Sequence, residues 1–397
     1  MNLRIRISDD PRPFGRRLAL ISFGWKPGSK VYGVYISFPF CRQKCTYCNF
    51  ASGVFTAELQ SAYLLALRQE ILAGDKPAFD TLYLGGGTPS LLSESELADL
   101  VAALEIQSLG EFTVEAAPGD LTREKAEAWA KLGVNRVSFG VQSFDQKVAR
   151  SSGRKHTAAT VVEEVALLRS VGIERVSVDL IAGLAWQTPE TWAADFEWIE
   201  RLAVRHVSVY MLESDDDSRL GAELRKGGSR YGASAVPSEE QIADSYLYAV
   251  QRLQSLGIQR YEISNFAAPG HESRHNRKYW TLQPYLGFGA DAHSFDGARR
   301  WANVPEPSEY VGRTNAGQSI RVTDEFIDDG RRAEDLLMTG LRTREGVTLP
   351  TASLSRLQGP IARLTGLGWL EQPTPDRLRL TDEGILFSNE ALEQLLF

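Results

Sequence analysis

Cysteine is scarce in this chain, and its distribution excludes a disulfide framework. Of 397 residues only three are cysteine, and Cys41, Cys45 and Cys48 all lie within eight positions. An odd number of cysteines spaced this tightly is not the pattern of a disulfide-stabilised secreted domain, because any pair would leave one thiol over. Thiols kept free for a metal fit a reducing compartment, so we expect a cytoplasmic protein.

The chain also lacks long apolar runs and an excess of positive charge. No stretch approaches about 18 uncharged apolar residues, so we expect no transmembrane helix, and peripheral contact with a membrane is left open. The net charge of −7 argues against a nucleic-acid partner bound through phosphate neutralisation. Residues 1–30 contain several arginines but no apolar core followed by a cleavage site, so we interpret them as neither a secretory signal nor a transit peptide.

Strand-like and helix-like patterns alternate from residue 31 to about residue 212. The β-rich runs are 31–38, 81–84, 112–115, 136–140, 175–181 and 206–212, and helical patterns lie between them at 63–72, 94–104, 123–131, 158–170 and 192–202. Alternation of this kind predicts parallel strands joined by helical crossovers. Six such units predict an α/β fold built on a partial (β/α)6 barrel.

Beyond residue 212 the alternation ends, and the remaining segments predict a different organisation. We divide the chain into an N-terminal extension (1–30), the partial barrel (31–265), a connecting segment rich in histidine and aromatic residues (266–323) and a C-terminal domain (324–397). The connecting segment has weak periodicity, and ordered loops of that length are usually functional. Helices at 331–342, 353–366 and 382–396 around a short β pair predict that the last domain is small and winged-helix-like.

The three cysteines lie on a short loop directly after the first buried strand. Three thiolates can ligate three corners of a 4Fe–4S cubane, which normally takes four cysteines. Because the chain has no fourth cysteine, one iron is expected to be open or to take an exogenous ligand. The alternative is a structural zinc site completed by one of the five histidines, but the C-x3-C-x2-C spacing lacks the paired C-x2-C halves of such sites.

Polar residues and glycines collect at the ends of several predicted strands. In a βα barrel the carboxyl ends of the strands share one face, where ligand sites are built. A single acidic residue at such a place is more often a helix cap or a solvated loop residue. Five strand ends that carry such groups together favour a site, formed by the cysteine loop and by Gly86, Gly87, Thr88, Glu115, Gln142 and Asp179.

The cysteine motif, followed by Asn49-Phe50, resembles the radical SAM superfamily, and the segment Tyr-Ile-Ser-Phe-Pro-Phe-Cys at 35–41 resembles its HemN/HemW branch. The similarity extends from about residue 31 to the C-terminus. It implies that the open iron binds the amino and carboxylate groups of S-adenosylmethionine (SAM), and that Gly-Gly-Gly-Thr-Pro at 85–89 contacts the amino group. It also implies that the cofactor is contacted by Tyr35, Tyr47, Glu115, Gln142, Arg154 and Asp179. Ala185-Trp186 departs from the Pro-Gly usual in the family.

Within this branch, the choice lies between an enzyme and a chaperone. The oxygen-independent coproporphyrinogen III dehydrogenase carries another cysteine where this chain has Phe50, and it has a longer N-terminal extension. The sequence His-Asn-x-x-Tyr-Trp at 275–280 instead resembles the HemW signature, although Asp291 stands in a nearby segment where that family usually has glycine. The resemblance implies a non-enzymatic heme chaperone that passes heme to an unidentified acceptor protein. The dehydrogenase and a related radical SAM methyltransferase are the alternatives, and a homodimer is left open.

Residues 267–280 form the expected heme dock. A histidine nitrogen can ligate heme iron axially, neighbouring aromatic rings can stack on a porphyrin, and basic side chains can pair with its propionates. We therefore predict that His275 is the axial ligand, with His271 and His293 as competing candidates. His206, at the start of a predicted strand, is interpreted as a packing or hydrogen-bonding histidine.

Overall fold

Six parallel strands form the central part of the fold. The computed structural model describes residues 31–213 and 218–396, so the predicted N-terminal extension lies outside the described residues. The strands are β1 (Val31–Phe38), β2 (Ala78–Gly86), β3 (Glu111–Ala116), β4 (Arg136–Gln142), β5 (Arg175–Ala182) and β6 (His206–Met211). They pair in chain order, each parallel to the next, which is the arrangement predicted from the alternation.

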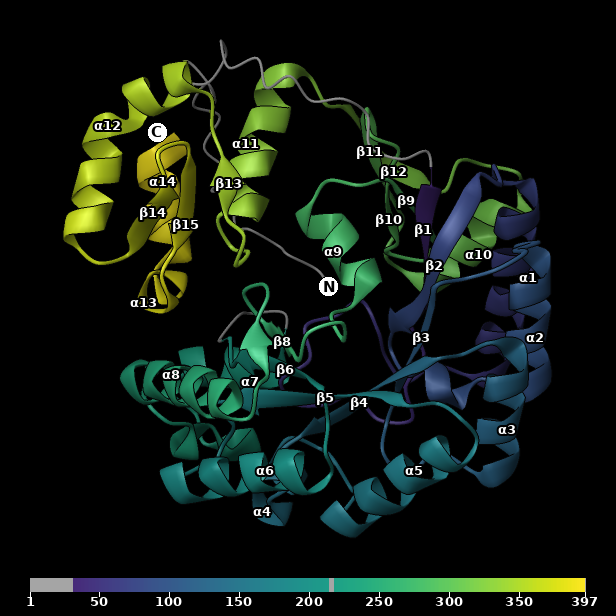
Figure 1. The fold of residues 1–397 in the computed structure, drawn as a ribbon. Helices are drawn as coiled ribbons and strands as arrows, with labels where there is room; N and C mark the ends of the chain where they lie inside the picture. Colours follow the sequence, from purple (N-terminus) through teal and green to yellow (C-terminus); the bar gives the residue numbers. More distant parts are fainter. Residues whose placement is uncertain (1–30, 214–217, 397) are drawn as a thin grey trace.

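Helices cover the outer side of this curved sheet (Figure 1). The crossovers contain α1 (Ala57–Ala73), η1 (Pro89–Leu91), α2 (Glu94–Ala103), α3 (Arg123–Leu132), α4 (Gln146–Ser151), α5 (Ala158–Ser170) and α6 (Pro189–Arg201). Side-chain caps mark several helix starts, as at Ser93, whose hydroxyl accepts from the backbone N–H of Glu96. The predicted α/β fold with a partial (β/α)6 barrel is confirmed.

The two faces of the barrel strands carry different chemistry. On β1, Val34, Ile36 and Phe38 are fully buried in the apolar core that the helices share. Successive side chains of a strand point to opposite faces, so Tyr35 and its counterparts on the other strands point to the inside of the barrel. That inner face is polar and aromatic: Tyr83 contacts both Tyr35 and Glu115, and Ser138 contacts Asp179.

Further short strands, from residues 259–326, extend the sheet beyond both ends of the barrel. β9 (Tyr285–Phe288) pairs parallel to β1, and β10 (His293–Phe295), β11 (Arg299–Asn303) and β12 (Arg321–Phe326) continue antiparallel. At the other end β8 (Asn265–Ala267) and β7 (Gln259–Arg260) follow β6. The expectation of long loops after residue 265 is therefore wrong, because strands of three to five residues are too short to show a clear alternation in the sequence.

Helices fill the remaining part of the middle of the chain. After β6 come α7 (Arg219–Arg225), η2 (Arg230–Ala235) and the long α8 (Glu239–Ser255). The HemW-like signature forms a short helix, α9 (Arg274–Trp280), and α10 (Pro307–Asn315) packs on α1. No helix in the described ranges is long and apolar enough to cross a membrane.

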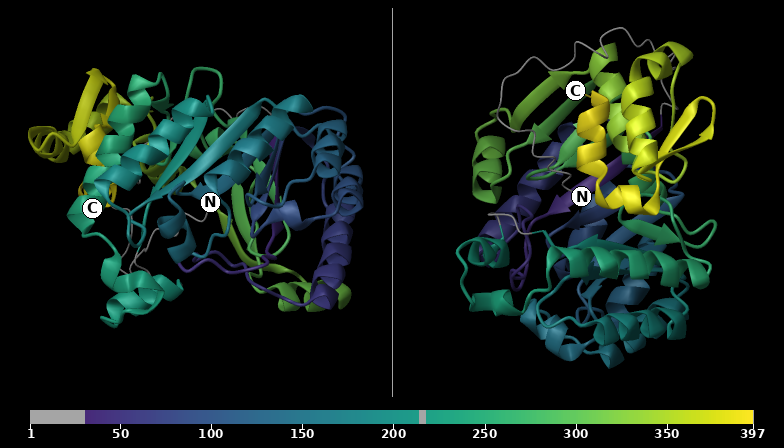
Figure 2. Two further views of the ribbon diagram at one scale, coloured as in Figure 1. Left: turned by 90° about the horizontal axis from the view of Figure 1, so that it is seen from below. Right: turned by 90° about the vertical axis from the view of Figure 1, so that its left-hand side faces the viewer.

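The C-terminal residues form a separate lobe beside α8 and α9 (Figures 1 and 2). It contains α11 (Asp329–Gly340), β13 (Val347–Thr348), α12 (Thr351–Gly366), β14 (Leu370–Thr374), β15 (Arg377–Leu380), α13 (Asp382–Leu386) and α14 (Ser388–Leu396). Its three strands form an antiparallel sheet in the order β13-β15-β14. Arg260 joins the lobe to the barrel through an ion pair with Asp382 at 2.9 Å. The winged-helix likeness stays a prediction.

Candidate functional site

The loop that carries the cysteines is hydrogen-bonded to the glycine segment after β2. Thr88 donates its backbone N–H to the carbonyl of Phe40, and Gly87 donates to the carbonyl of Phe38 at 2.8 Å. A Cβ atom at Gly87 would stand 2.7 Å from the carbonyl oxygen of Phe40, closer than real Cβ atoms approach. Only glycine therefore permits this contact, which places the segment after β2 directly beside the cysteines.

The three thiols are free and partly exposed. Burial raises the pKa of the Cys41 thiol, while hydrogen bonds with Thr88 and Ser52 act in the opposite direction. In the part of the chain that the structure describes, no three Cys, His, Asp or Glu side chains converge on one point as a single metal ion requires. In a 4Fe–4S cubane each thiolate binds a different iron, so convergence is not needed. Three thiolates are the donors that three corners of such a cluster take.

Two carboxyl groups, from β3 and β5, lie on the inner face of the barrel. Glu115 accepts a hydrogen bond from the Tyr83 hydroxyl at 2.8 Å, and Asp179 accepts one from Ser138 at 3.1 Å. Removal from water raises the pKa of both carboxyls, to about 7 for Asp179, to which the nearby charge of Glu115 contributes. Two partly buried acids whose charges act on each other favour a ligand that brings positive charge.

Arg154 and Gln142 each have a buried polar atom that lacks a hydrogen-bond partner among the described residues. Arg154 donates to the Tyr47 hydroxyl at 3.2 Å, but its Nε has no hydrogen-bond partner among the described residues, and neither has the Oε1 of Gln142. Gln142 also has a φ of 70°, a conformation that non-glycine residues adopt rarely. A Cβ at Gly140 would lie within 3.1 Å of both side chains, so the two groups are neighbours. Buried polar groups without partners are uncommon, and here they indicate a polar ligand.

The structure thus brings the predicted cofactor residues together at one end of the barrel. Tyr35 lies beside the glycine segment, since its hydroxyl is 3.5 Å from where a Cβ of Gly86 would stand. Three thiols, a glycine cradle, two acids and two unsatisfied polar atoms fit a 4Fe–4S cluster that carries SAM. Sequence reasoning missed Tyr83, Ser138 and Ser208, which contact the two acids. The sequence could have indicated these residues, because strand alternation places them on the same face of the sheet as Glu115 and Asp179.

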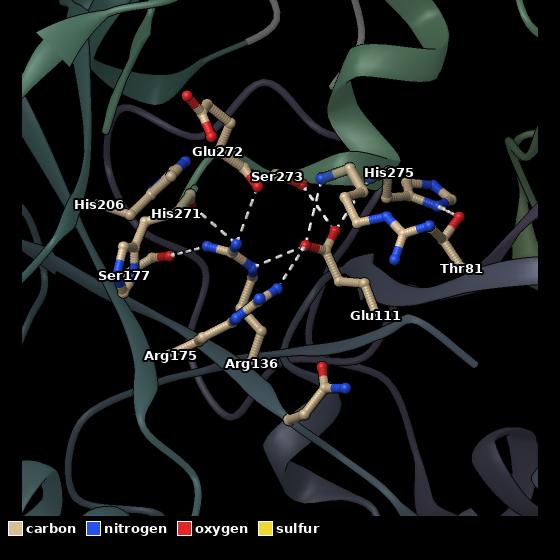
Figure 3. A network of polar contacts seen from close by, with 12 residues as sticks. Thr81, Glu111, Arg136, Arg175, Ser177, His206, His271, Glu272, Ser273 and His275 are labelled. Atoms are coloured by element: carbon tan, nitrogen blue, oxygen red, sulfur yellow. Dashed lines mark hydrogen bonds and ion pairs between the residues drawn. The ribbon is translucent and has the colours of Figure 1, made fainter. Parts of the chain in front are cut away.

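His275 lies in a different setting from the open loop expected for it. It is on α9, is only 1% exposed, and stacks on the Tyr83 ring at 5.2 Å. Its Nδ1 is 2.9 Å from the Thr81 hydroxyl and its Nε2 is 2.8 Å from the Tyr279 hydroxyl (Figure 3 shows the contact with Thr81). Burial lowers its pKa to about 3, so the ring is neutral. The open-loop expectation is corrected, and iron ligation by His275 now requires the loss of one hydrogen bond.

The start of α9 is tied to the amino ends of β3 and β4, away from the cysteine loop. Glu111 pairs with Arg136 at 3.1 Å and accepts from the backbone N–H of His275 at 2.9 Å (Figure 3). Arg136 also donates to the carbonyl oxygens of His271 and Glu272. The segment before α9 is therefore fixed in place by buried charges. The other candidate histidines differ, since His271 is partly exposed and His293 is exposed.

His206 fits its interpretation as a packing histidine. It is buried at the start of β6, and its Nε2 lies 2.9 Å from the Tyr261 hydroxyl. Burial and the charge of Arg136 hold its pKa well below the ordinary value, so it is neutral. It lies beside the Arg136 network rather than near the cysteines (Figure 3).

The comparisons with known proteins agree with one another. Residues 35–199 match the family model of the Radical SAM superfamily. The heme chaperone HemW of Lactococcus lactis is 34% identical over 378 residues, which cover 92% of this chain and 98% of that protein. HemW of Bacillus subtilis is 35% identical over 324 residues, 79% of this chain and 84% of that protein. The structure of Escherichia coli coproporphyrinogen III oxidase (HemN) aligns with a TM-score of 0.78 over 92% of this chain and 90% of its own, at 20% identity, which shows a shared fold.

Proposed function

Because this chain belongs to the HemW family of radical SAM proteins, we propose that it is a cytoplasmic heme chaperone that holds a 4Fe–4S cluster with SAM and passes heme to an acceptor protein. The observation that supports the cofactor part is the barrel end, where three thiols without a fourth lie beside unsatisfied polar atoms. The heme part rests on the chain's similarity to proteins named heme chaperones.

Each group at the barrel end has a role in this proposal. Cys41, Cys45 and Cys48 ligate the cluster, which together with SAM supplies redox chemistry when bound. Gly86, Gly87 and Thr88 give the cofactor close access to the backbone, and Tyr35 and Tyr47 line the site. Glu115, Gln142 and Asp179 bind polar groups of SAM, and Arg154 holds its carboxylate.

An enzyme that acts on a porphyrin is the alternative, and the fold shared with HemN is the observation that favours it. Phe50 is the observation against it, because it stands where that enzyme carries another cysteine. Its side chain is 42% exposed at the cysteine loop and offers no group for acid–base or redox chemistry. A related radical SAM methyltransferase is the third alternative.

The test is anaerobic reconstitution of the cluster, followed by two assays on the same preparation. Titration with heme, followed by the Soret band, is expected to show saturable binding. Incubation with coproporphyrinogen III, SAM and a reductant is expected to give no protoporphyrinogen. Formation of protoporphyrinogen would establish the enzyme instead, and absence of heme binding would remove the chaperone proposal.

A further inference from the structure

Two aromatic residues near the carboxyl end of the barrel have a backbone conformation that bulky residues rarely adopt. Trp186, in the loop between β5 and α6, has a φ of 69°, and Tyr231, in η2, has a φ of 59°. Glycine or asparagine usually occupies such positions, and a bulky side chain there is a strained outlier. Strain of this kind persists where the surrounding structure enforces it, and it concentrates at functional sites. The backbone N–H of Trp186 is held by the carbonyl of Ala235 at 2.9 Å.

The two residues belong to one surface patch. Gly232 follows Tyr231 in the chain, and a Cβ at Gly232 would stand 3.4 Å from the indole nitrogen of Trp186. Lys147 lies over the Trp186 ring at 4.0 Å, and Arg219 and Arg230 lie over the Tyr231 ring at 5.5 Å and 5.1 Å. We refer to Lys147, Trp186, Arg219, Arg230 and Tyr231 as the mouth patch.

The mouth patch borders the cysteine loop. Arg219 donates a hydrogen bond to the carbonyl of Lys44, and the next residue, Leu220, donates its N–H to the carbonyl of Thr46 at 2.8 Å. On the other side, Ser151 donates to the carbonyl of Ala185 at 3.2 Å, and its neighbour Ser152 accepts from the N–H of Thr46. The segments that carry the patch therefore contact the cysteine loop or its neighbours from two sides.

We propose that the mouth patch is a heme-binding surface, in which the porphyrin plane packs on Trp186 and the propionates pair with the neighbouring cations. Trp186 is 46% exposed, and its indole offers a large flat apolar surface for a planar macrocycle. Lys147, Arg219 and Arg230 are exposed beside the two rings, on a chain whose net charge is −7. Positive side chains next to aromatic faces complement heme, which is a flat apolar macrocycle with two propionate carboxylates at one edge.

This inference rests on the proposed heme binding and differs from the dock expected around His275. His275 is enclosed and doubly hydrogen-bonded, whereas Trp186 is 46% exposed, with Lys147 over one face of its ring. Heme at this surface would lie next to the cysteine loop, so the two cofactors would share one end of the barrel.

The strain gives the proposal a test that separates binding from folding. In Trp186→Gly the new residue adopts a positive φ without strain, so the thermal midpoint is expected to be unchanged or higher than that of wild type. Heme affinity of the same reconstituted protein, measured by Soret titration with ferric heme, is expected to fall about tenfold or more with the loss of the stacking surface. A merely structural role for Trp186 would lower the midpoint instead.

Matched controls come from a second aromatic–cation pair away from the mouth. Trp198 on α6 lies under Arg201 at 5.1 Å, so Trp198→Ala and Arg201→Gln should leave heme affinity within about twofold of wild type. Lys147→Gln should weaken heme binding several-fold and reduce its dependence on salt. If wild type binds heme and Trp186→Gly binds it equally well, the mouth patch is refuted while the chaperone proposal stands. If wild type binds no heme, the proposed function fails and this inference with it.

Discussion

Replacement of His275 by phenylalanine tests whether this histidine is a structural element of the barrel interior. The substitution keeps an aromatic ring against Tyr83 but removes the hydrogen bonds at Nδ1 and Nε2. The hydroxyls of Thr81, fully buried, and of Tyr279, partly buried, then lose their partner. An unsatisfied buried hydroxyl costs roughly 1–3 kcal/mol, so we expect the free energy of unfolding to fall by about 2–4 kcal/mol.

Urea unfolding at pH 7.5, followed by circular dichroism, measures this loss. Thr81→Val and Tyr279→Phe serve as partner variants, because each removes one of the two hydrogen bonds from the other side. In a double-mutant cycle the losses of His275→Phe and Tyr279→Phe should not add, since both include the same hydrogen bond. A loss below about 0.5 kcal/mol in His275→Phe would refute the structural role.

The pH dependence of the same variant gives a second check. The pKa of His275 is about 3 in the folded protein, whereas an unfolded histidine titrates near 6.5. Between these values the unfolded chain binds a proton that the folded chain does not, so this histidine lowers stability as the pH falls through that window. The deficit of His275→Phe should therefore shrink by about 2 kcal/mol between pH 7.5 and pH 5. An equal deficit at both pH values would show that His275 is not buried as a neutral ring.

Four further outcomes are expected. Anaerobically reconstituted protein should contain about four irons and four sulfides per chain. Replacement of any one of the three cysteines by serine should abolish this iron and sulfide content. Stoichiometric zinc without sulfide would contradict the cluster. Glu115→Ala or Asp179→Ala should weaken SAM binding about ten- to a hundred-fold in calorimetry with the cluster intact, and unchanged affinity in both would mean that the barrel end is misassigned. Because the pKa of Asp179 is raised to about 7, SAM affinity should fall as the pH drops below that value, and Asp179→Asn should show a flatter profile. If His275 ligates heme iron, Tyr279→Phe should raise heme affinity by freeing Nε2, and unchanged Soret spectra in both Tyr279→Phe and His275→Ala would leave His271 and His293 as candidates.

Local patterns in the sequence determined the parallel barrel and the place of the cysteine loop. Strand and helix periodicities, and the glycines after β2, act over a few neighbouring residues, so they are legible without the rest of the chain. The gathering of Glu115, Gln142 and Asp179 also followed from the sequence, because the carboxyl ends of parallel strands must share one face.

Only the tertiary structure decided what surrounds His275. The carboxylate that holds its backbone, Glu111, is 164 residues away in the chain, and Thr81 is 194 residues away. Contacts over such separations depend on how β9 and α9 close against β1 and β2, which no local pattern encodes. The strain at Trp186 has the same origin, since the positive φ follows from contacts with η2 rather than from the preference of tryptophan. A side chain's chemistry can thus be read from the sequence, but its accessibility is set by residues that folding brings to it from far along the chain.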